Sequence, residues 1–312
     1  MDINGFSLNP LNMADSNPGR VQYCPGGVGR NIAENLHRLG EDVRFIGVIG
    51  DDPGGELIRN SGAHIGLNIE HSLFPKNGIT SVYIALMDSD GEMKLALADM
   101  DIMEQMTVEH LESKAGIIEE SAIVLLDTNL PERIISFILE RFSGDNSANG
   151  ESSAGKSPLF FLDAVSARKA PRAASRIGSF DTIKLGRMEA SVLSGIGIGG
   201  AGEKLKEAAD HFLDKGARRV FITMGKEGVY AASAKGSLYR PVYYTRPLNT
   251  SGGGDAFMAG IVYGAMRGWD EEEIVSFSLA MARLTVRSKS VVAPEICLEL
   301  VKNEESKMRN KE

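Results

Sequence analysis

Short apolar runs alternate with amphipathic segments along most of the chain. The runs are rich in Val, Ile, Leu and Phe and lie between polar or glycine-containing stretches, which is typical of buried strands. They predict strands at residues 43–49, 80–87, 92–98, 122–126, 159–162, 182–185, 219–223 and 228–233.

Several of the intervening segments carry apolar residues at helical spacing. In residues 27–39 these are Val28, Ile32, Leu36 and Leu39. Residues 131–142 open with a proline, which is favoured at the first helical position. Strand–helix alternation of this kind predicts an α/β fold in which helices cover both faces of a mostly parallel sheet.

Residues 80–98 depart from the alternation. Two predicted strands flank Asp88-Ser89-Asp90-Gly91, which is typical of a hairpin turn. A hairpin outside the main pattern indicates a small lid or dimer flap. Residues 143–157 have almost no apolar content and predict a flexible surface loop.

Charge and cysteine content narrow the classes of function. The 312 residues include 34 basic and 42 acidic ones, a net charge of −8 that argues against a nucleic-acid polymer as partner. A single nucleotide remains compatible, since a few amides and one or two cations bind it. Cys24 and Cys297 are far apart, which fits a reducing cytoplasm and neither a disulfide framework nor a metal site. No apolar run approaches a membrane span, and the acidic first residues do not resemble a signal peptide.

Two glycine-rich segments match nucleotide-binding patterns in the wrong context. Residues 150–157 match GxxxxGK[ST], but a helix precedes them and a strand follows, the reverse of the order that phosphate binding requires. Residues 195–202 contain GxGxxG, but the preceding segment is helical and no acidic residue follows at the expected distance. A solvated loop and a connection between helices are the favoured interpretations.

A third glycine-rich segment, residues 249–260, reads NTSGGGDAFMAG. Three glycines lead directly into a predicted helix, so free amides and the positive end of the helix dipole point at one spot and create an anion site. Asp255 at this place is explained if it takes a proton from a hydroxyl while the amides hold a phosphoryl group. The alternative is a helix-capping Asp after a glycine turn.

A similar arrangement occurs near the start of the chain. Gly26 and Gly27 precede a predicted helix and let a small polyol approach the backbone. Asn31 lies on the polar side of this helix and supplies a donor and an acceptor for a diol.

Together the two segments resemble the signatures of the ribokinase-like (PfkB) carbohydrate and nucleoside kinases, and they occur in the same order. GGVGRNIAENLHRLG lies near the start and NTSGGGDAFMAG near the end. The resemblance covers essentially the whole chain. It implies one ribokinase-like three-layer domain over residues 1–312, with a β-lid formed by about residues 1–25 and 80–98.

Within this family the chain is most similar to the kinases that phosphorylate pseudouridine. The similarity lies in residues 11–21 (LNMADSNPGRV), 25–36, 98–102, 163–169 (DAVSARK) and 188–195. It implies transfer of a phosphoryl group from ATP to the 5′-hydroxyl of pseudouridine. Another acceptor such as ribose, uridine or adenosine remains open, as does a catalytically weak nucleoside-binding protein.

The resemblance also implies the roles of individual residues. Asp255 is the base, and the amides of Gly252, Gly253 and Gly254 hold the anion. The implied contacts to the acceptor are Asp2, Gly26, Gly27, Asn31, Asp99, Asp101 and Asn129. Thr223, Gly225, Gly228 and Gly186 line the ATP site, and Glu189 positions Mg²⁺. A monovalent cation such as K⁺ and a homodimer through the lid are further expectations.

Three positions depart from the family pattern. The family has an N-terminal strand ending in Asn-x-Asp, which a chain starting at Met1-Asp2 lacks; a misassigned start is the favoured interpretation, and a sheet that lacks this strand is the alternative. Gly186 replaces a usual Asn, which removes a polar group near the phosphates and metal. Gly253 replaces a usual Ala, and the backbone role tolerates this.

Overall fold

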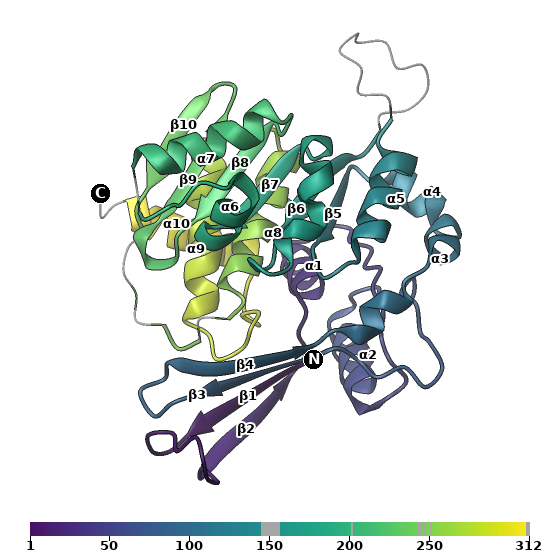
Figure 1. Ribbon diagram of the computed structural model, residues 1–312, viewed down its shortest axis with the longest axis vertical. Helices are drawn as coiled ribbons and strands as arrows, with labels where there is room; N and C mark the ends of the chain where they lie inside the picture. Colours follow the sequence, from purple (N-terminus) through teal and green to yellow (C-terminus); the bar gives the residue numbers. More distant parts are fainter. Residues whose placement is uncertain (145–156, 201, 243–244, 246, 250, 310–312) are drawn as a thin grey trace. The chain divides into compact units, whose positions relative to one another are not determined.

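A computed structural model of the chain describes residues 1–144, 157–200, 202–242, 245, 247–249 and 251–309. The chain divides into two compact units (Figure 1). The smaller unit comprises Met1–Ala33 and Val43–Met106, and the larger comprises Glu34–Asp42 and Thr107–Glu312. One of the boundaries, between Ala33 and Glu34, falls within helix α1 (Val28–Arg38).

The larger unit is built on a six-stranded sheet in the order β10-β9-β8-β7-β6-β5. The first four strands along the chain run parallel, and the last two form an antiparallel hairpin beside them. Their bounds are β5 (Ile123–Asp127), β6 (Leu159–Asp163), β7 (Thr182–Gly186), β8 (Arg219–Thr223), β9 (Val229–Ser233) and β10 (Gly236–Arg240). The predicted mostly parallel sheet is confirmed.

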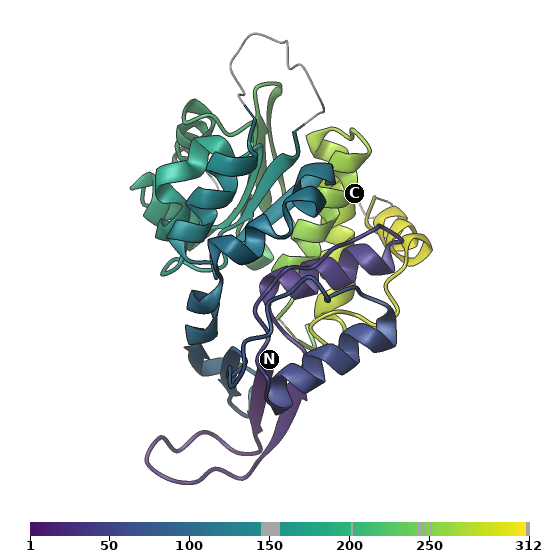
Figure 2. The same cartoon turned by 90° about the vertical axis from the view of Figure 1, so that its right-hand side faces the viewer.

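Helices cover both faces of this sheet, as Figure 2 shows. One face carries α5 (Glu132–Phe142), η2 (Ala170–Ser179), α6 (Arg187–Ser194) and α7 (Glu203–Asp214), and the other carries α8 (Gly253–Met266) and α9 (Glu271–Val286). The remaining helices of this unit are α3 (Val108–Glu112), α4 (Ala115–Glu120), η3 (Gly225–Glu227) and α10 (Leu298–Arg309), the last against α9. These three layers are the predicted α/β sandwich.

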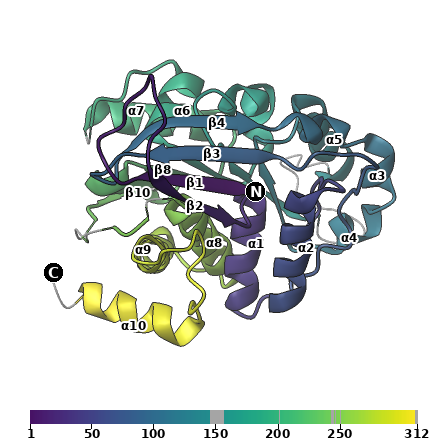
Figure 3. The same ribbon diagram turned by 90° about the horizontal axis from the view of Figure 1, so that it is seen from below.

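The smaller unit contains a four-stranded sheet in the order β2-β1-β3-β4 (Figure 3). Its strands are β1 (Asp2–Ser7), β2 (Gly19–Cys24), β3 (Val82–Met87) and β4 (Met93–Asp99). The predicted hairpin is confirmed: the Asp88 N–H donates to the Glu92 carbonyl at 2.9 Å, and Gly91 adopts a φ of 81°. These four strands lie in the segments predicted to form a lid, about residues 1–25 and 80–98. That this sheet moves as a lid stays a prediction.

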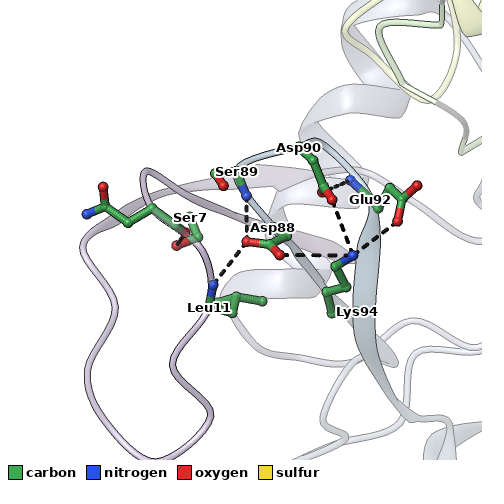
Figure 4. Close-up of polar contacts among 8 residues, drawn as sticks. Ser7, Leu11, Asp88, Ser89, Asp90, Glu92 and Lys94 are labelled. Atoms are coloured by element: carbon green, nitrogen blue, oxygen red, sulfur yellow. Dashed lines mark hydrogen bonds and ion pairs between the residues drawn. The ribbon is translucent and has the colours of Figure 1, made fainter.

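The turn of this hairpin holds the chain that joins β1 to β2 (Figure 4). The carboxylate of Asp88 accepts the Leu11 N–H at 3.0 Å, and Lys94 pairs with Asp90 and Glu92 at 3.3 and 3.0 Å. Within the joining loop, the Asn17 side chain accepts the Asn12 N–H at 2.8 Å and donates to the Asn12 carbonyl at 2.9 Å. The run DSNPG therefore shapes a structured loop at this end of the sheet.

The predicted strand at residues 43–49 is wrong. Only isolated bridges occur there, between Arg44 and Asn68 and between Val48 and Leu73. Glycines at 47 and 50 weaken a strand because they have no side chain to pack and lose more entropy on ordering. Besides the start of α1, the smaller unit contains the helices α2 (Pro53–Ile65) and η1 (Asp101–Gln105).

Of the two segments that match nucleotide-binding patterns in the wrong context, the structure describes most of residues 195–202 but only the last residue of 150–157. α6 ends at Ser194, its C-cap Gly195 has a φ of 75°, and α7 begins at Glu203, so residues 195–202, apart from residue 201, connect two helices as predicted. Residues 150–156, like most of the predicted loop at 143–157, lie outside the described residues. Both cysteine thiols are free, and across the described ranges no helix has the length and apolar character to cross a membrane.

Helix α8 is buried on all sides from residue 256 to residue 264. This explains why it lacks the one-sided apolar pattern of a surface helix. Glycines allow α9 to approach it closely: a Cβ at Gly260 would lie 2.6 Å from the Ser278 Cα, and one at Gly264 would lie 2.7 Å from Ile274. The packing fixes the helix that carries Asp255.

We therefore expect Gly260→Ala to destabilise the protein by about 1–3 kcal/mol, because the added methyl group meets backbone that must move. Gly116→Ala in α4 is the matched control, since its Cβ would meet no atom within 4 Å. An alanine there is expected to be neutral or to add up to about 1 kcal/mol of stability. Urea denaturation measures both, and equal midpoints for the two variants would contradict this account of α8 packing.

Candidate active site

Most of the residues predicted to bind the nucleotide lie at or near the carboxyl ends of the parallel strands. Asp163 on β6 lies opposite Lys184 on β7, and Gly186 at the end of β7 lies opposite Thr223 on β8. In open α/β sheets this edge is where ligands bind, because the loops that follow the strands diverge there.

The glycine turn before α8 has the geometry of an anion site. Gly252 occupies the N-cap position with a φ of 81°, and a Cβ there would lie 1.8 Å from the Val291 carbonyl oxygen, so only glycine fits. Gly253 and Gly254 open the helix, where backbone N–H groups have no partner within the helix. Thr250 lies outside the described residues.

Asp255 is the third residue of α8 and is half-buried. The N-cap position is occupied by Gly252, which has no side chain to cap the helix. The interpretation of Asp255 as the N-capping residue is therefore wrong, and its role as a base beside the anion site stays a prediction.

Beneath this turn lies an ion pair that sequence reasoning missed. The Lys184 ammonium is 2.9 Å from the Asp163 carboxylate, and their side chains are 10% and 1% exposed. The same ammonium would lie 3.2 Å from a Cβ on Gly254, which places it next to the first turn of α8. The lysine within the otherwise apolar run of β7 was the feature of the sequence that could have indicated this buried ion pair.

The charge of Lys184 is maintained by its neighbours. Burial opposes the ammonium, but the charges of Asp163 and Asp255 and the hydrogen bond to Asp163 outweigh it and raise the pKa of Lys184 above its usual value. A fixed positive charge thus lies beside the amides and the carboxylate at the helix start.

Asp163 also holds a strained turn. Its second carboxylate oxygen accepts the Val165 N–H at 2.9 Å, and Val165 adopts a φ of 56°. A β-branched residue in the left-handed region costs of the order of 1–3 kcal/mol and is characteristic of functional sites. Asp163 therefore fixes both Lys184 and the chain that follows β6.

Glu189 folds back onto Gly186. A Cβ on Gly186 would lie 2.1 Å from a carboxylate oxygen of Glu189. The polar group expected to be lost through Gly186 is therefore replaced in space by this carboxylate. Next to it, Arg187 pairs with Glu227 at 2.5 Å and donates to the Gly199 carbonyl at 3.0 Å, which ties the start of α6 to η3 and to the segment that follows α6.

The predicted nucleotide loop follows β8. The Thr223 hydroxyl donates to the Leu185 carbonyl at 3.3 Å, which ties the ends of β7 and β8. Gly225 and Gly228 have φ values of 56° and 133°, and a Cβ on Gly228 would lie 2.3 Å from the Arg240 carbonyl oxygen. Gly228 is thus required by backbone packing, whereas a Cβ on Gly225 would meet no atom within 4 Å.

Asn129 lies after β5 and is 9% exposed. Its side-chain oxygen accepts from the Lys169 ammonium at 2.5 Å, and Arg172 donates to the Asn129 carbonyl at 2.9 Å. Burial lowers the pKa of Lys169, against the attraction of Asp127. Contact between Asn129 and the acceptor stays a prediction.

In the smaller unit the structure brings Asp2 and Gly26 together. A Cβ on Gly26 would lie 2.1 Å from an Asp2 carboxylate oxygen, so the glycine provides the room for this side chain. Asp2 pairs in register with Cys24 on β2 and Tyr83 on β3. Gly27, with a φ of 103°, leads into α1, and its carbonyl accepts the Asn31 N–H at 2.8 Å.

The two other predicted acceptor contacts of this unit are Asp99 and Asp101, both exposed. Asp99 lies opposite Val82 at the same end of the sheet as Asp2, but strand alternation directs the two side chains to opposite faces. The Asp101 N–H donates to Asp99 at 3.2 Å. Their contact with an acceptor stays a prediction.

Comparison with known proteins identifies the family. The model of the pfkB family of carbohydrate kinases matches residues 1–296. The chain belongs to this family. Pseudouridine kinase of Escherichia coli K12 is 33% identical over 98% of the chain and 95% of its own length.

Solved structures of pfkB-like kinases share the fold. The crystal structure of a putative sugar kinase from Clostridium perfringens is 32% identical, covers 98% of this chain and 92% of its own, and has a TM-score of 0.80. A ribokinase from Arabidopsis thaliana, solved with ribose and ATP, is 20% identical to this chain and has a TM-score of 0.81. The match covers 97% of this chain and 95% of the ribokinase, and at this identity it shows a shared fold alone. The chain is accordingly a sugar or nucleoside kinase, a phosphotransferase with a hydroxyl group as acceptor.

For this pfkB kinase we expect Lys184→Met to cost about 3–5 kcal/mol, because it leaves the Asp163 carboxylate buried without its cation. The double variant Asp163→Asn, Lys184→Met should regain most of this stability, since it buries no charge there and Asn still accepts the Val165 N–H. Lys206→Met is the control: its pair with Asp210 is exposed, so its loss should leave the stability nearly unchanged.

Urea denaturation at neutral pH measures all three variants. A double variant as unstable as Lys184→Met alone would show that packing of the lysine, rather than charge compensation, explains the loss.

Proposed function

We propose that the chain transfers the γ-phosphoryl group of ATP to the 5′-hydroxyl of pseudouridine. The observation that carries the reaction is the position of Asp255 in the first turn of α8, behind the glycine turn and within the electrostatic reach of Lys184. The acceptor is supported by the similarity to the Escherichia coli pseudouridine kinase.

In this mechanism Asp255 accepts the proton of the 5′-hydroxyl as that oxygen bonds to phosphorus. The bond from phosphorus to the leaving ADP oxygen breaks in the same displacement. The amides of Gly252, Gly253 and Gly254 and the Lys184 ammonium stabilise the charge of the transferring group, so catalysis is mostly positioning and electrostatics.

Mg²⁺ fits the residues present at the end of β7. In the described part of the chain, no three His, Cys, Asp or Glu side chains are grouped as metal ligands. Mg²⁺ commonly uses one or two carboxylates together with waters and substrate phosphates, and Glu189 offers such a carboxylate. When bound, the ion neutralises phosphate charge. A requirement for K⁺ stays a prediction.

Binding of the acceptor is assigned to the smaller unit. Asp2 accepts hydrogen bonds from the ribose hydroxyls, Asn31 contributes its side-chain amide, and Gly27 allows close approach to the backbone. The ribose does not distinguish pseudouridine from uridine, so the base must be recognised elsewhere.

We further propose that two copies of the chain associate through one face of the four-stranded sheet. Strand register places Tyr23, Ile3, Ile84 and Leu97 in one row and Val21, Gly5, Leu86 and Leu95 in the next. Tyr23, Val21, Leu95 and Leu97 are 62%, 62%, 49% and 65% exposed. A continuous apolar face of this kind is unusual on a monomer, and a second copy supplies the same face to cover it.

Asp255→Asn should lower kcat for pseudouridine about 10²–10⁴-fold, because the proton acceptor is lost, with little change in the KM for ATP. Asp210→Asn, an exposed carboxylate on α7, is the control and should behave as wild type. The assay is ADP release with Mg-ATP across pseudouridine, uridine, ribose and adenosine. Near-wild-type turnover by Asp255→Asn refutes the proposed base, and preference for another acceptor refutes pseudouridine.

Leu97→Lys should convert the dimer to a monomer, because it places a charge in the apolar face that the partner covers. Ile79→Lys is the control, since Ile79 is an equally exposed apolar residue, at 69%, outside the sheet. Light scattering during size-exclusion chromatography measures the mass. A monomeric wild-type protein, or a Leu97→Lys variant that remains dimeric, would exclude this interface.

A further inference from the structure

Arg30 is a buried cation in the acceptor-binding half of the molecule. It is the third residue of α1 and is 5% exposed. Removing a guanidinium from water is expensive unless charges and hydrogen bonds compensate it. The groups around Arg30 must therefore compensate its charge.

Arg30 acts on two of the residues assigned to the ribose. Its guanidinium donates to the Asn31 side-chain oxygen at 3.1 Å, and Asn31 is 3% exposed. The bond sets the orientation of the amide: the oxygen faces Arg30 and the nitrogen faces away. The positive charge of Arg30 also acts on the Asp2 carboxylate.

We propose that Arg30 is the positioning residue for the ribose diol of the acceptor: it fixes the amide of Asn31 as a donor and supplies a permanent positive charge that acts on the Asp2 carboxylate. This inference rests on the proposed function, in which Asp2 and Asn31 hold the ribose. A diol then meets one group that donates and one that accepts, which suits two neighbouring hydroxyls.

The surroundings of Asp2 make the compensating charge necessary. Burial raises the pKa of Asp2, while the Met1 ammonium and Arg30 act in the opposite direction. The Cys24 thiol and the Tyr83 phenol face Asp2 from the adjacent strands, and burial raises the pKa of both, so they stay neutral near pH 7. Burial lowers the pKa of the Met1 ammonium, against the attraction of Asp2 and Asp52. Arg30 is the neighbouring cation that cannot lose its proton.

Loss of Arg30 should make acceptor binding more sensitive to acid. Without Arg30 the pKa of Asp2 rises further, so protonation of Asp2 begins at a higher pH and removes the acceptor for the diol. Acceptor affinity of an Arg30→Met variant should therefore fall more steeply on acidification than that of the wild type.

Two variants separate the hydrogen bond from the charge. Arg30→Met should raise the KM for the acceptor about 10–100-fold with a smaller change in kcat and an unchanged KM for ATP, as loss of about one to two charge-assisted hydrogen bonds implies. It should also shift the acid limb of the pH profile of kcat/KM upward by at least about one unit. Arg30→Lys should restore the pH profile but only part of the KM, because an ammonium lacks the fork of donors.

Arg309→Met, at the end of α10, is the matched control for loss of an arginine and should leave the KM and the pH profile unchanged. Thermal melts of every variant separate a loss of stability from a loss of affinity. A folded Arg30→Met variant with wild-type KM and pH profile overturns the inference, and so does an Arg30→Lys variant that shares the shifted profile.

The acceptor used is the one that wild-type enzyme phosphorylates best among pseudouridine, uridine, ribose and adenosine. A different preferred acceptor thus refutes the proposed substrate and leaves the Arg30 comparison intact, because each carries the diol. If wild-type enzyme phosphorylates none of them, calorimetric binding of pseudouridine and ribose is compared between wild type and Arg30→Met, and equal affinity or no binding overturns the inference.

Discussion

The buried pair of Lys184 and Asp163 is the interaction on which the phosphoryl-transfer half of the molecule depends. An ammonium placed in the middle of a parallel sheet is tolerated because a carboxylate on the neighbouring strand lies 2.9 Å away. From that position the charge reaches the first turn of α8 and the carboxylate of Asp255. The same Asp163 holds the strained turn at Val165, so one carboxylate fixes both the cation and the loop after β6.

The second constraint is the close approach of backbone to backbone around α8. Gly252 turns against the Val291 carbonyl, and Gly260 lets α9 approach. The helix is buried on all sides, so its start cannot shift without repacking the core. The proposed role of Asp255 as a base requires a fixed distance from the phosphoryl group, and this rigidity would maintain it.

In the smaller unit, the side chains assigned to the acceptor are also held in place by their neighbours. Asp2 fits into the room left by Gly26, and Arg30 compensates its burial and orients Asn31. The loop of residues 8–18 follows the end of β1 that lies far from Asp2. Ser7, the last residue of β1, lies about 17 Å along the strand from Asp2, at about 3.3 Å per residue.

The sequence by itself determined the features that depend on neighbouring residues. Alternating apolar runs indicated the parallel sheet, and the glycine triplet before a helix indicated the anion site at Asp255. It also indicated the hairpin at residues 88–91. These follow from local periodicity and turn chemistry, which short segments carry within themselves.

Tertiary structure alone decided which distant residues became partners. Lys184 joins Asp163 because β6 and β7 pair in one register, and Glu189 fills the space at Gly186 because α6 folds back on the end of its strand. The predicted strand at residues 43–49 failed because a strand needs a partner ladder, and this segment has only single bridges. Burial, charge compensation and pairing register are properties of the packed chain, so no local pattern could supply them.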